Sequence, residues 1–236
     1  MRDSVDTSGR WKTFRFTSHD NPHISAQALA DITWDMTRMA YRQEVEAEDI
    51  NEIPGALWSR AVIEASRVTV CPTLTRIVVA IDPSVTSGEG SDEAGIVTGG
   101  LGKDGNGYLL ADLSRRDSPM GWATVAIEEY RRQRADRIVG EVNNGGDMIE
   151  QTLRTIDPNI SYEAVNASRG KLIRAEPICA LYEQGRIHHV GNFEQLEEEI
   201  CSYVPGATSP NRMDAMVWLF TKLVLERRPE ARIEVW

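Results

Sequence analysis

Arg76-Ile77-Val78-Val79-Ala80-Ile81-Asp82-Pro83-Ser84 is the stretch from which the fold can be worked out. Its apolar run has the length and the β-branched content of a strand that is buried on both faces. Pro83 has no N–H to give to a sheet, so the strand is predicted to end there. The sequence thus leaves Asp82 at the edge of a core, where a carboxylate needs a partner or a cation.

Two further acidic residues, Glu141 and Asp214, occupy similar apolar settings. Glu141 lies near the end of a predicted buried strand, and ligand sites gather at that end of α/β sheets. Asp214 lies in a predicted helix whose neighbouring residues are almost all apolar. Each acid also has a plain structural explanation: a turn at Asp82, an ion pair at Glu141, a helix-dipole charge at Asp214. Three carboxylates aimed at one point would instead hold hard divalent cations, which serve phosphoryl-transfer chemistry.

The composition is that of an ordinary globular protein, with 236 residues, 41% hydrophobic and 26% charged. This length suits one large domain, or one medium domain with an appendage. No apolar run approaches the roughly 18 residues of a membrane span. Three widely spaced cysteines fit neither a disulfide framework nor a zinc site, which favours a reducing, cytoplasmic setting.

The net charge of −10 argues against tight, non-specific nucleic-acid binding by the whole surface. A local basic groove remains compatible with this charge. We therefore expect that any nucleic acid is delivered by a partner or by another domain.

The chain is expected to divide near residue 75. Residues 1–74 are predicted to be mostly helical, with helices near 25–46 and 54–67, and to be a linker or the remnant of an upstream domain. From residue 75 to 236, hydrophobic patterns predict strands at 76–82, 94–100, 107–113, 137–142, 160–165 and 186–190, with helices between and after them. An antiparallel hairpin followed by parallel units implies one mixed α/β sheet with helices on both faces.

Four motifs in this order resemble the nuclease domain of the large terminase subunit of tailed bacteriophages. They are Ile81-Asp82-Pro83-Ser84, the Gly140–Gly146 segment, the Arg169–Gly185 segment and Arg212-Met213-Asp214-Ala215. Residues 17–23 and 41–44 resemble the stretch between the ATPase and nuclease domains of that protein, so residues 1–74 would be a linker or the remnant of an upstream ATPase domain. The resemblance implies an RNase H-like fold for residues 75–236 and cleavage of packaged DNA with two Mg²⁺ or Mn²⁺ ions.

The resemblance also implies roles for individual residues. Asp82, Glu141 and Asp214 match the three metal-binding acids, and Lys171 is expected to act next to them in catalysis. Asp92 and Asp147 match more loosely as auxiliary acids. The side chains expected to form a small basic rim that holds DNA phosphates are Arg169, Lys171, Arg174 and Arg212.

The partners implied by the resemblance are double-stranded DNA, the portal protein, the small terminase subunit and an upstream ATPase domain, all in the host cell cytoplasm and without a membrane. The sequence has no Gly-x4-Gly-Lys-Ser/Thr phosphate loop, so the ATPase motor is expected to lie outside this chain. Gly100-x-Gly102-x-x-Gly105 spells a dinucleotide fingerprint, but a predicted strand follows it where a helix is required.

Two other functions fit the same residues. Ile81-Asp82-Pro83 also suits a Holliday-junction resolvase of the same fold, although a resolvase would be more basic. A docking module for the portal or the motor would keep the three acids for structural reasons only. Metal-dependent nicking of DNA separates both nucleases from the docking module, and a preference for four-way junctions separates the resolvase from the packaging nuclease.

Overall fold

The apolar run at residues 76–82 forms strand β4 (Leu74–Asp82), whose last five residues are all buried. Pro83 follows the strand directly. In the sheet, β4 pairs antiparallel with β5 (Gly95–Gly102) and parallel with β7 (Arg137–Glu141). β4 therefore lies inside the sheet with a neighbour on each side, as its apolar sequence predicts.

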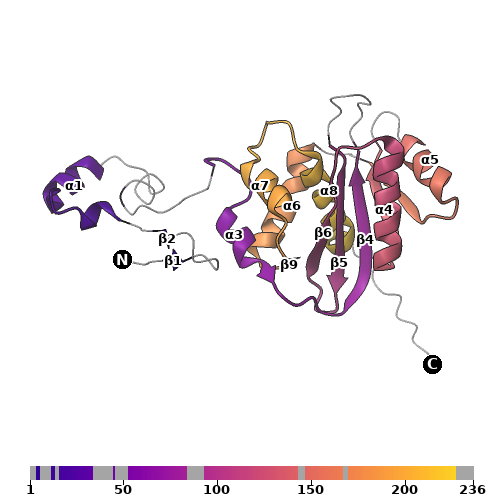
Figure 1. Cartoon of the computed structure of the whole chain (residues 1–236), viewed down its shortest axis with the longest axis horizontal. Helices are drawn as coiled ribbons and strands as arrows, with labels where there is room; N and C mark the ends of the chain where they lie inside the picture. The colour runs from indigo at the N-terminus through magenta and orange to yellow at the C-terminus, as the bar shows by residue number, and fades with distance from the viewer. Residues whose placement is uncertain are drawn as a thin grey trace. The chain divides into compact units, whose positions relative to one another are not determined.

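The computed structural model of the chain describes residues 4–5, 12–13, 16–33, 45, 53–83, 93–142, 147–166 and 170–226. The chain divides into two compact units, residues 1–51 and 52–236. In the first unit, β1 (Ser4–Val5) pairs antiparallel with β2 (Lys12–Thr13), and η1 (Ser18–Asp20) and α1 (Ala26–Thr33) follow (Figure 1). Of the helix expected at 25–46, the described part is α1, and residues 34–44 lie outside the description.

The second unit is a seven-stranded mixed sheet with the strand order β3-β9-β6-β5-β4-β7-β8. Its remaining elements are α3 (Arg60–Ala65), β3 (Arg67–Val68), β6 (Gly107–Asp112), α4 (Pro119–Gln133), α5 (Asp147–Ile156), β8 (Tyr162–Val165), α6 (Lys171–Glu183), β9 (Ile187–Val190), α7 (Glu194–Ser202), α8 (Asn211–Phe220) and the π-helix η2 (Thr221–Leu225). β5 and β6 form the predicted antiparallel hairpin, and β7, β8 and β9 each pair parallel to a neighbour.

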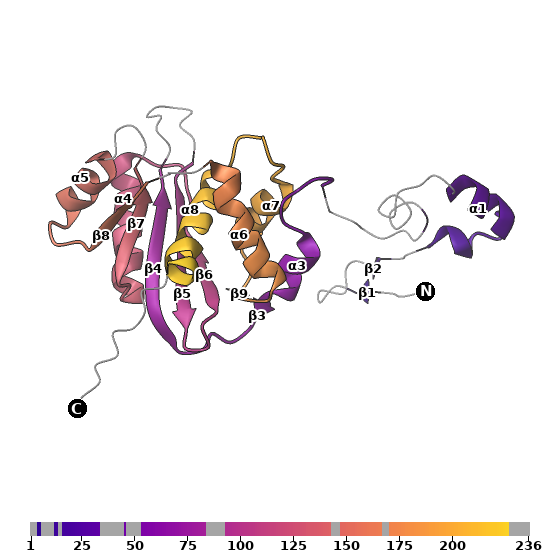
Figure 2. The ribbon, with the colours of Figure 1, turned by 180° about the vertical axis from the view of Figure 1, so that it is seen from behind.

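Helices cover both faces of this sheet, which confirms the predicted fold class. One core cluster joins β4 and β7 to α3, α6, α7 and α8, and the other joins the opposite face to α4 and α5. Figure 2 shows α6 and α8 in front of the strands, and Figure 1 shows α4 on the other side. No helix among the described residues is long and apolar enough to cross a membrane.

Helix α8 packs directly on β5, and two glycines make this close approach feasible. Every residue of α8 from Arg212 to Phe220 is buried. A Cβ atom at Gly95 would lie 2.1 Å from the Asn211 carbonyl oxygen, and one at Gly99 would lie 2.8 Å from the Leu219 side chain. Because Gly95 and Gly99 are an even number of residues apart, they lie on the same face of β5, under α8.

Residues 52–74 belong to the second compact unit. Trp58 and Ile63 are buried in the core beside α6 and α7, and β3 adds an edge strand next to β9. Helix α7 was not predicted from sequence, because it offers few apolar positions among its acidic residues. The capping position of α8 is Pro210.

A buried polar network ties four of these elements together around His189. The Glu197 carboxylate accepts from His189 Nδ1 at 2.8 Å and from Arg67 at 3.0 Å, and His189 Nε2 lies 2.8 Å from the Tyr182 hydroxyl. Burial lowers the pKa of His189, so the ring is neutral and Nε2 accepts from Tyr182. Burial would raise the pKa of Glu197, but hydrogen bonds from His189 and Arg67 outweigh it and lower this pKa to about 2.

Replacing Glu197 by Gln is expected to lower the free energy of unfolding at pH 7 by about 2 kcal/mol, since hydrogen bonds to a charged group contribute roughly that much. The folded pKa of about 2 lies below the ordinary 4.5, so this stabilisation is complete above about pH 4.5 and is lost as the pH falls toward 2. Denaturant unfolding at several pH values measures it. Glu198→Gln, at the exposed neighbouring position, is the control and should change stability by less than about 0.5 kcal/mol.

Candidate metal centre

Strands β4 and β7 bring Asp82 and Glu141 side by side. Ile81 pairs with Gly140 in the parallel register, so the next residue of each strand continues the same pairing. Val78 and Ala80 of β4 and Val139 of β7 face the core that contains α6 and α8. Because side chains alternate along a strand, Asp82 and Glu141 face that same side. Their exposed fractions are only 6% and 5%.

Asp214 reaches the same region from the first turn of α8. Its Oδ2 atom accepts from the Lys171 ammonium at 2.6 Å and from the Ser209 hydroxyl at 2.5 Å. Lys171 also donates to the Ser209 oxygen at 2.6 Å. The Asp214 carboxylate is therefore neutralised by one cation and oriented by one hydroxyl.

The negative charge of Glu141 is likewise compensated by hydrogen bonds from neighbouring side chains. Its Oε2 atom accepts from Arg174 Nη1 at 3.0 Å and from the indole Nε1–H of Trp218 at 2.6 Å. The Arg174 guanidinium also lies over the Trp218 ring, 4.5 Å from its centre. Arg174 is therefore engaged both by the carboxylate and by the aromatic face.

Lys171 and Arg174 lie in the first turn of α6, which has no acidic residue there. The helix dipole disfavours cations at this end. Burial lowers the pKa of Lys171, but the hydrogen bond from Lys171 to Asp214 and the nearby acids outweigh it and raise this pKa. These two cations are placed where they neutralise Asp214 and Glu141, and not where they would best stabilise their own helix.

Asp82 is the one acid of the three to which no described residue donates a hydrogen bond. Burial, the Asp214 charge and the Glu141 charge raise the pKa of Asp82 to about 7, and Lys171 and Arg174 oppose this shift. At neutral pH, this carboxyl is therefore ionised only in part. Asp82 thus lies next to two carboxylates that are each paired with a cation, but it has no cationic partner of its own among the described residues.

The chemistry of this donor set fits a hard divalent cation. Carboxylate oxygens are the ligands that Mg²⁺ and Mn²⁺ prefer, and such ions would supply the charge that Asp82 lacks. Among the described residues, no three acidic, histidine or cysteine side chains are grouped so that they would hold a metal ion as they stand. Lys171 and Arg174 contact two of the three carboxylates in that arrangement.

Arg212, a member of the predicted basic rim, is buried and paired with acidic groups. Its side chain is 6% exposed. It is surrounded by carboxylate and amide groups from three other segments: Glu93 before β5, Asp112 of β6, and Gln195 and Glu199 of α7. Asn211 also donates to the Glu93 carbonyl oxygen. Arg212 thus anchors the start of α8, two residues before Asp214.

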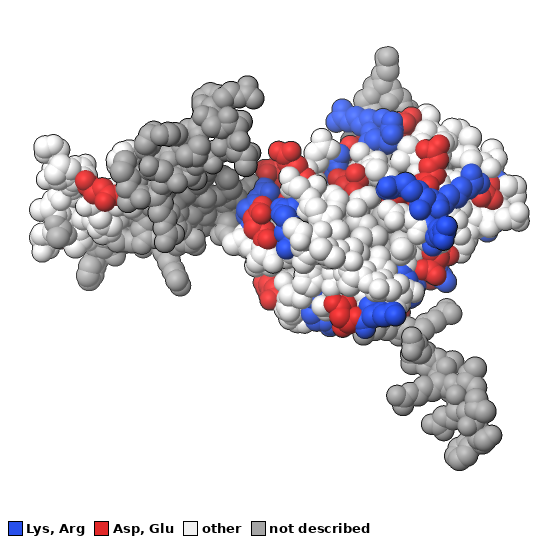
Figure 3. All heavy atoms as spheres, turned by 60° about the horizontal axis from the view of Figure 1, so that its bottom comes forward, with Lys and Arg blue, Asp and Glu red and all other residues white. Residues whose placement is uncertain are grey.

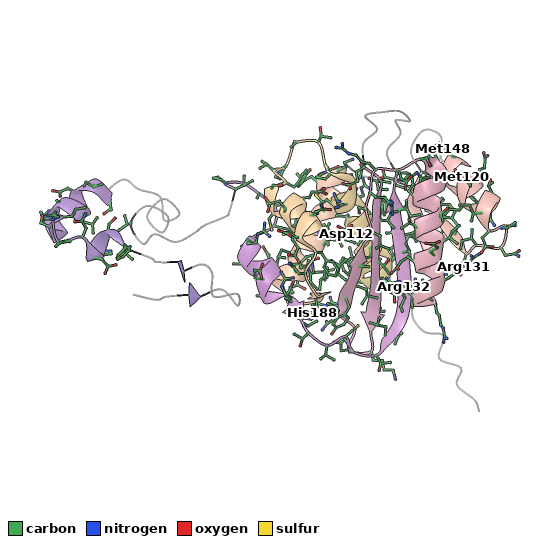
Figure 4. The ribbon with its side chains drawn as sticks, viewed as in Figure 1. Asp112, Met120, Arg131, Arg132, Met148 and His188 are labelled. Carbon is green, nitrogen blue, oxygen red and sulfur yellow. The ribbon has the colours of Figure 1, made fainter. Side chains whose placement is uncertain are left out.

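Three other site residues were predicted from the sequence, Asp92, Asp147 and Arg169. Asp92 and Arg169 lie outside the described residues. Asp147 is the first residue of α5. Met120 and Met148, each almost half exposed, are the second residues of α4 and α5 and lie at the same end of the domain (Figure 4).

Two residues of the site were not found from the sequence. Ser209 precedes a proline and has the pattern of a helix cap, yet its hydroxyl bonds the Asp214 side chain. Trp218 is part of an apolar run and has the pattern of a core residue. Its spacing of four residues from Asp214 places it on the same helix face, which is the signal that could have identified it.

The sequence matches the family model described as Terminase RNaseH-like domain over residues 79–223, more than half of the chain. The chain belongs to this family. The matched segment contains the three acids of the site, both cations of α6 and Trp218. The RNase H-like fold implied by the sequence motifs is thereby confirmed, whereas the roles of the individual side chains remain proposals.

Solved structures of large terminases have the same fold as this terminase RNase H-like domain. The large terminase of the thermophilic bacteriophage D6E aligns with a TM-score of 0.56 and 14% identity, over 87% of this chain and 54% of that one. The nuclease domain of the large terminase subunit gp2 of bacterial virus Sf6 aligns with a TM-score of 0.51 and 14% identity, over 70% and 97%. No curated protein matches the sequence. The chain thus spans about half the length of the D6E protein.

Replacing Asp82 by Asn in the metal-free terminase domain is expected to raise its stability at pH 8 by about 1–3 kcal/mol, at about 1.4 kcal/mol per pKa unit. The folded pKa of about 7 lies above the ordinary 3.8, so the wild type loses stability as the pH rises from about 4 to about 7. The gain should therefore be larger at pH 8 than at pH 5. Denaturant unfolding in a chelator measures both, and an equal gain at the two pH values would contradict the crowding of these acids.

Proposed function

We propose that this domain is a metal-dependent endonuclease that cuts phage DNA during genome packaging, with two Mg²⁺ or Mn²⁺ ions held by Asp82, Glu141 and Asp214. The observation that carries the proposal is the grouping of these three buried carboxylates on one side of the sheet, where the Asp82 carboxylate has no described hydrogen-bond donor. A purely structural cluster would be expected to neutralise every buried charge with a protein group.

The solved relatives support this proposal from a separate direction. The Sf6 protein that aligns over 97% of its own length is a nuclease domain. A variant of the Sf6 protein has been solved with calcium, and it aligns with a TM-score of 0.51. Calcium binds carboxylate oxygens, so its presence in that relative agrees with a carboxylate site in this chain.

Each residue of the site has a defined part in the proposed reaction. Bound divalent ions at such a centre activate a water and stabilise the leaving oxygen of a phosphodiester. Asp82, Glu141 and Asp214 hold the ions. Lys171 lies beside Asp214 with about half of its side chain exposed, so its ammonium is placed to contact a DNA phosphate. Ser209 keeps the Asp214 carboxylate oriented.

DNA contact by this domain is expected to be weak and local. On the face drawn in Figure 3, acidic and basic side chains alternate around a broad area without charged groups. The net charge of −10 opposes non-specific attraction to DNA. With Arg212 buried and Arg174 only 11% exposed, Lys171 is the member of the predicted rim that is open to a phosphate among the described residues. Few phosphate contacts imply a shallow salt dependence.

The rest of the packaging machinery is proposed to hold the DNA. The D6E large terminase has been solved in complex with ATP-γ-S, and this chain covers about half of its length. We propose that the nuclease works beside an ATPase domain of this kind, together with the portal protein and the small terminase subunit, in the host cytoplasm. Delivery of DNA by these partners would compensate for the acidic surface of the domain.

Purified protein is expected to convert supercoiled plasmid into nicked and linear forms with Mn²⁺ or Mg²⁺, and a chelator should stop the conversion. The reason is that the proposed reaction depends on ions held by the three acids. Agarose gels measure the conversion, with Asp82→Asn as the inactive control. Cleavage that survives excess chelator would contradict the proposal, and a strong preference for four-way junctions would favour the resolvase.

Replacing Lys171 by Ala is expected to reduce the cleavage rate by about 10²-fold, the usual loss when one group that stabilises transition-state charge is removed. Lys103→Ala is the matched control, because Lys103 lies in the β5–β6 turn at the opposite end of β4. Rates on plasmid at saturating Mn²⁺ measure both variants. Wild-type cleavage by Lys171→Ala would remove this side chain from the reaction.

A further inference from the structure

We propose that Trp218 is a positioning residue of the metal centre: together with Arg174, it holds Glu141 by one carboxylate oxygen and leaves the other oxygen, Oε1, to bind the metal. This inference rests on the proposed function, because it concerns how the chain prepares one ligand. It also assigns Arg174 a role different from the DNA-binding role that the sequence suggested.

Both hydrogen bonds to Glu141 end on the same atom. The indole Nε1–H of Trp218 donates to Oε2 at 2.6 Å, and Arg174 Nη1 donates to Oε2 at 3.0 Å. An anionic carboxylate oxygen with two donors has little capacity for a further ligand. Oε1 receives no hydrogen bond from a described residue, so it is the oxygen available to a cation.

The supporting groups are themselves fixed. Trp218 is 5% exposed and is enclosed in the core around α8. Arg174 lies over its ring, so the guanidinium is held between an aromatic face and a carboxylate. A ligand held by groups that are locked by packing keeps its orientation when the metal is absent, which is what a preorganised centre requires.

The spacing of residues along two helices produces this arrangement. Asp214 and Trp218 are four residues apart on α8, and Lys171 and Arg174 are three apart on α6, so each pair lies on one helix face. On α6, Lys171 contacts Asp214 and Arg174 contacts Glu141. On α8, Asp214 is itself one of the acids, and Trp218 contacts Glu141. α8 therefore carries one metal ligand and also orients a second ligand that belongs to β7.

A simpler role for Trp218 is to fill the core, and phenylalanine would then replace it with little effect on the metal. Trp58 offers a matched comparison. It is also buried in the same core cluster, and its indole N–H has no hydrogen-bond partner among the described residues. Trp218→Phe and Trp58→Phe thus make the same chemical change in the same core, but only the first removes a donor from Glu141.

Calorimetric titration of the wild-type protein and these variants with Mn²⁺ tests the inference without measuring cleavage. Trp218→Phe should weaken Mn²⁺ binding by about 10–100-fold, the usual loss when a group that orients a metal ligand is removed. Trp58→Phe should bind Mn²⁺ as the wild type does. Thermal unfolding in a chelator shows whether each variant is folded before titration.

A double-mutant cycle identifies the route of the effect. If Trp218 acts through Glu141, then Trp218→Phe should cause no further loss of Mn²⁺ binding in a protein that already carries Glu141→Gln. Wild-type affinity in Trp218→Phe, or additive losses in the double variant, would overturn the inference. If Trp218→Phe does not fold, Arg174→Gln makes the same test, because it removes the second donor to Oε2. A wild-type protein that binds no Mn²⁺ would instead overturn the proposed function.

Discussion

The burial of three carboxylates on one side of the sheet is the constraint on which the rest of this domain depends. Asp82, Glu141 and Asp214 are each less than 10% exposed, and buried like charges destabilise a fold unless they are compensated. The fold compensates two of them, with Lys171 on Asp214 and Arg174 on Glu141. The third carboxyl keeps a pKa near 7. The charge imbalance that remains is what a divalent cation would remove.

This constraint explains the arrangement of the helices on that face. α6 presents two cations from its first turn, although the helix dipole disfavours them there, and α8 presents an acid and an indole one turn apart. α8 can approach the sheet this closely because Gly95 and Gly99 leave room for it. Arg212, bonded to acids of several elements, fixes where α8 begins and so where Asp214 lies. A similar buried network around His189 secures the far edge of the sheet.

The sequence predicts the strands and the strand-end acids well, because these depend on local patterns. The run at β4, the hairpin of β5 and β6, and the placing of Asp82 and Glu141 at neighbouring strand ends all follow from alternation, turn residues and the rules for parallel strands. α7 and β3 were missed because one is mostly acidic and the other is two residues long.

Contacts between distant segments could not be predicted from the sequence. Ser209 has the pattern of a helix cap, Trp218 that of a core residue and Arg212 that of a surface cation, and each assignment is reasonable for its local sequence. Their true partners, Asp214, Glu141 and the acids around Arg212, are set by how α8 packs against β7, α6 and α7. Side-chain chemistry alone does not specify that packing.

The most direct test of this account is the anomalous diffraction of a crystal of the protein soaked in Mn²⁺. The account requires manganese peaks within bonding distance of carboxylate oxygens of Asp82, Glu141 and Asp214, with Oε2 of Glu141 still bonded to Trp218. Manganese bound only elsewhere, or no bound manganese with Lys171 and Arg174 still paired to their acids, would contradict it.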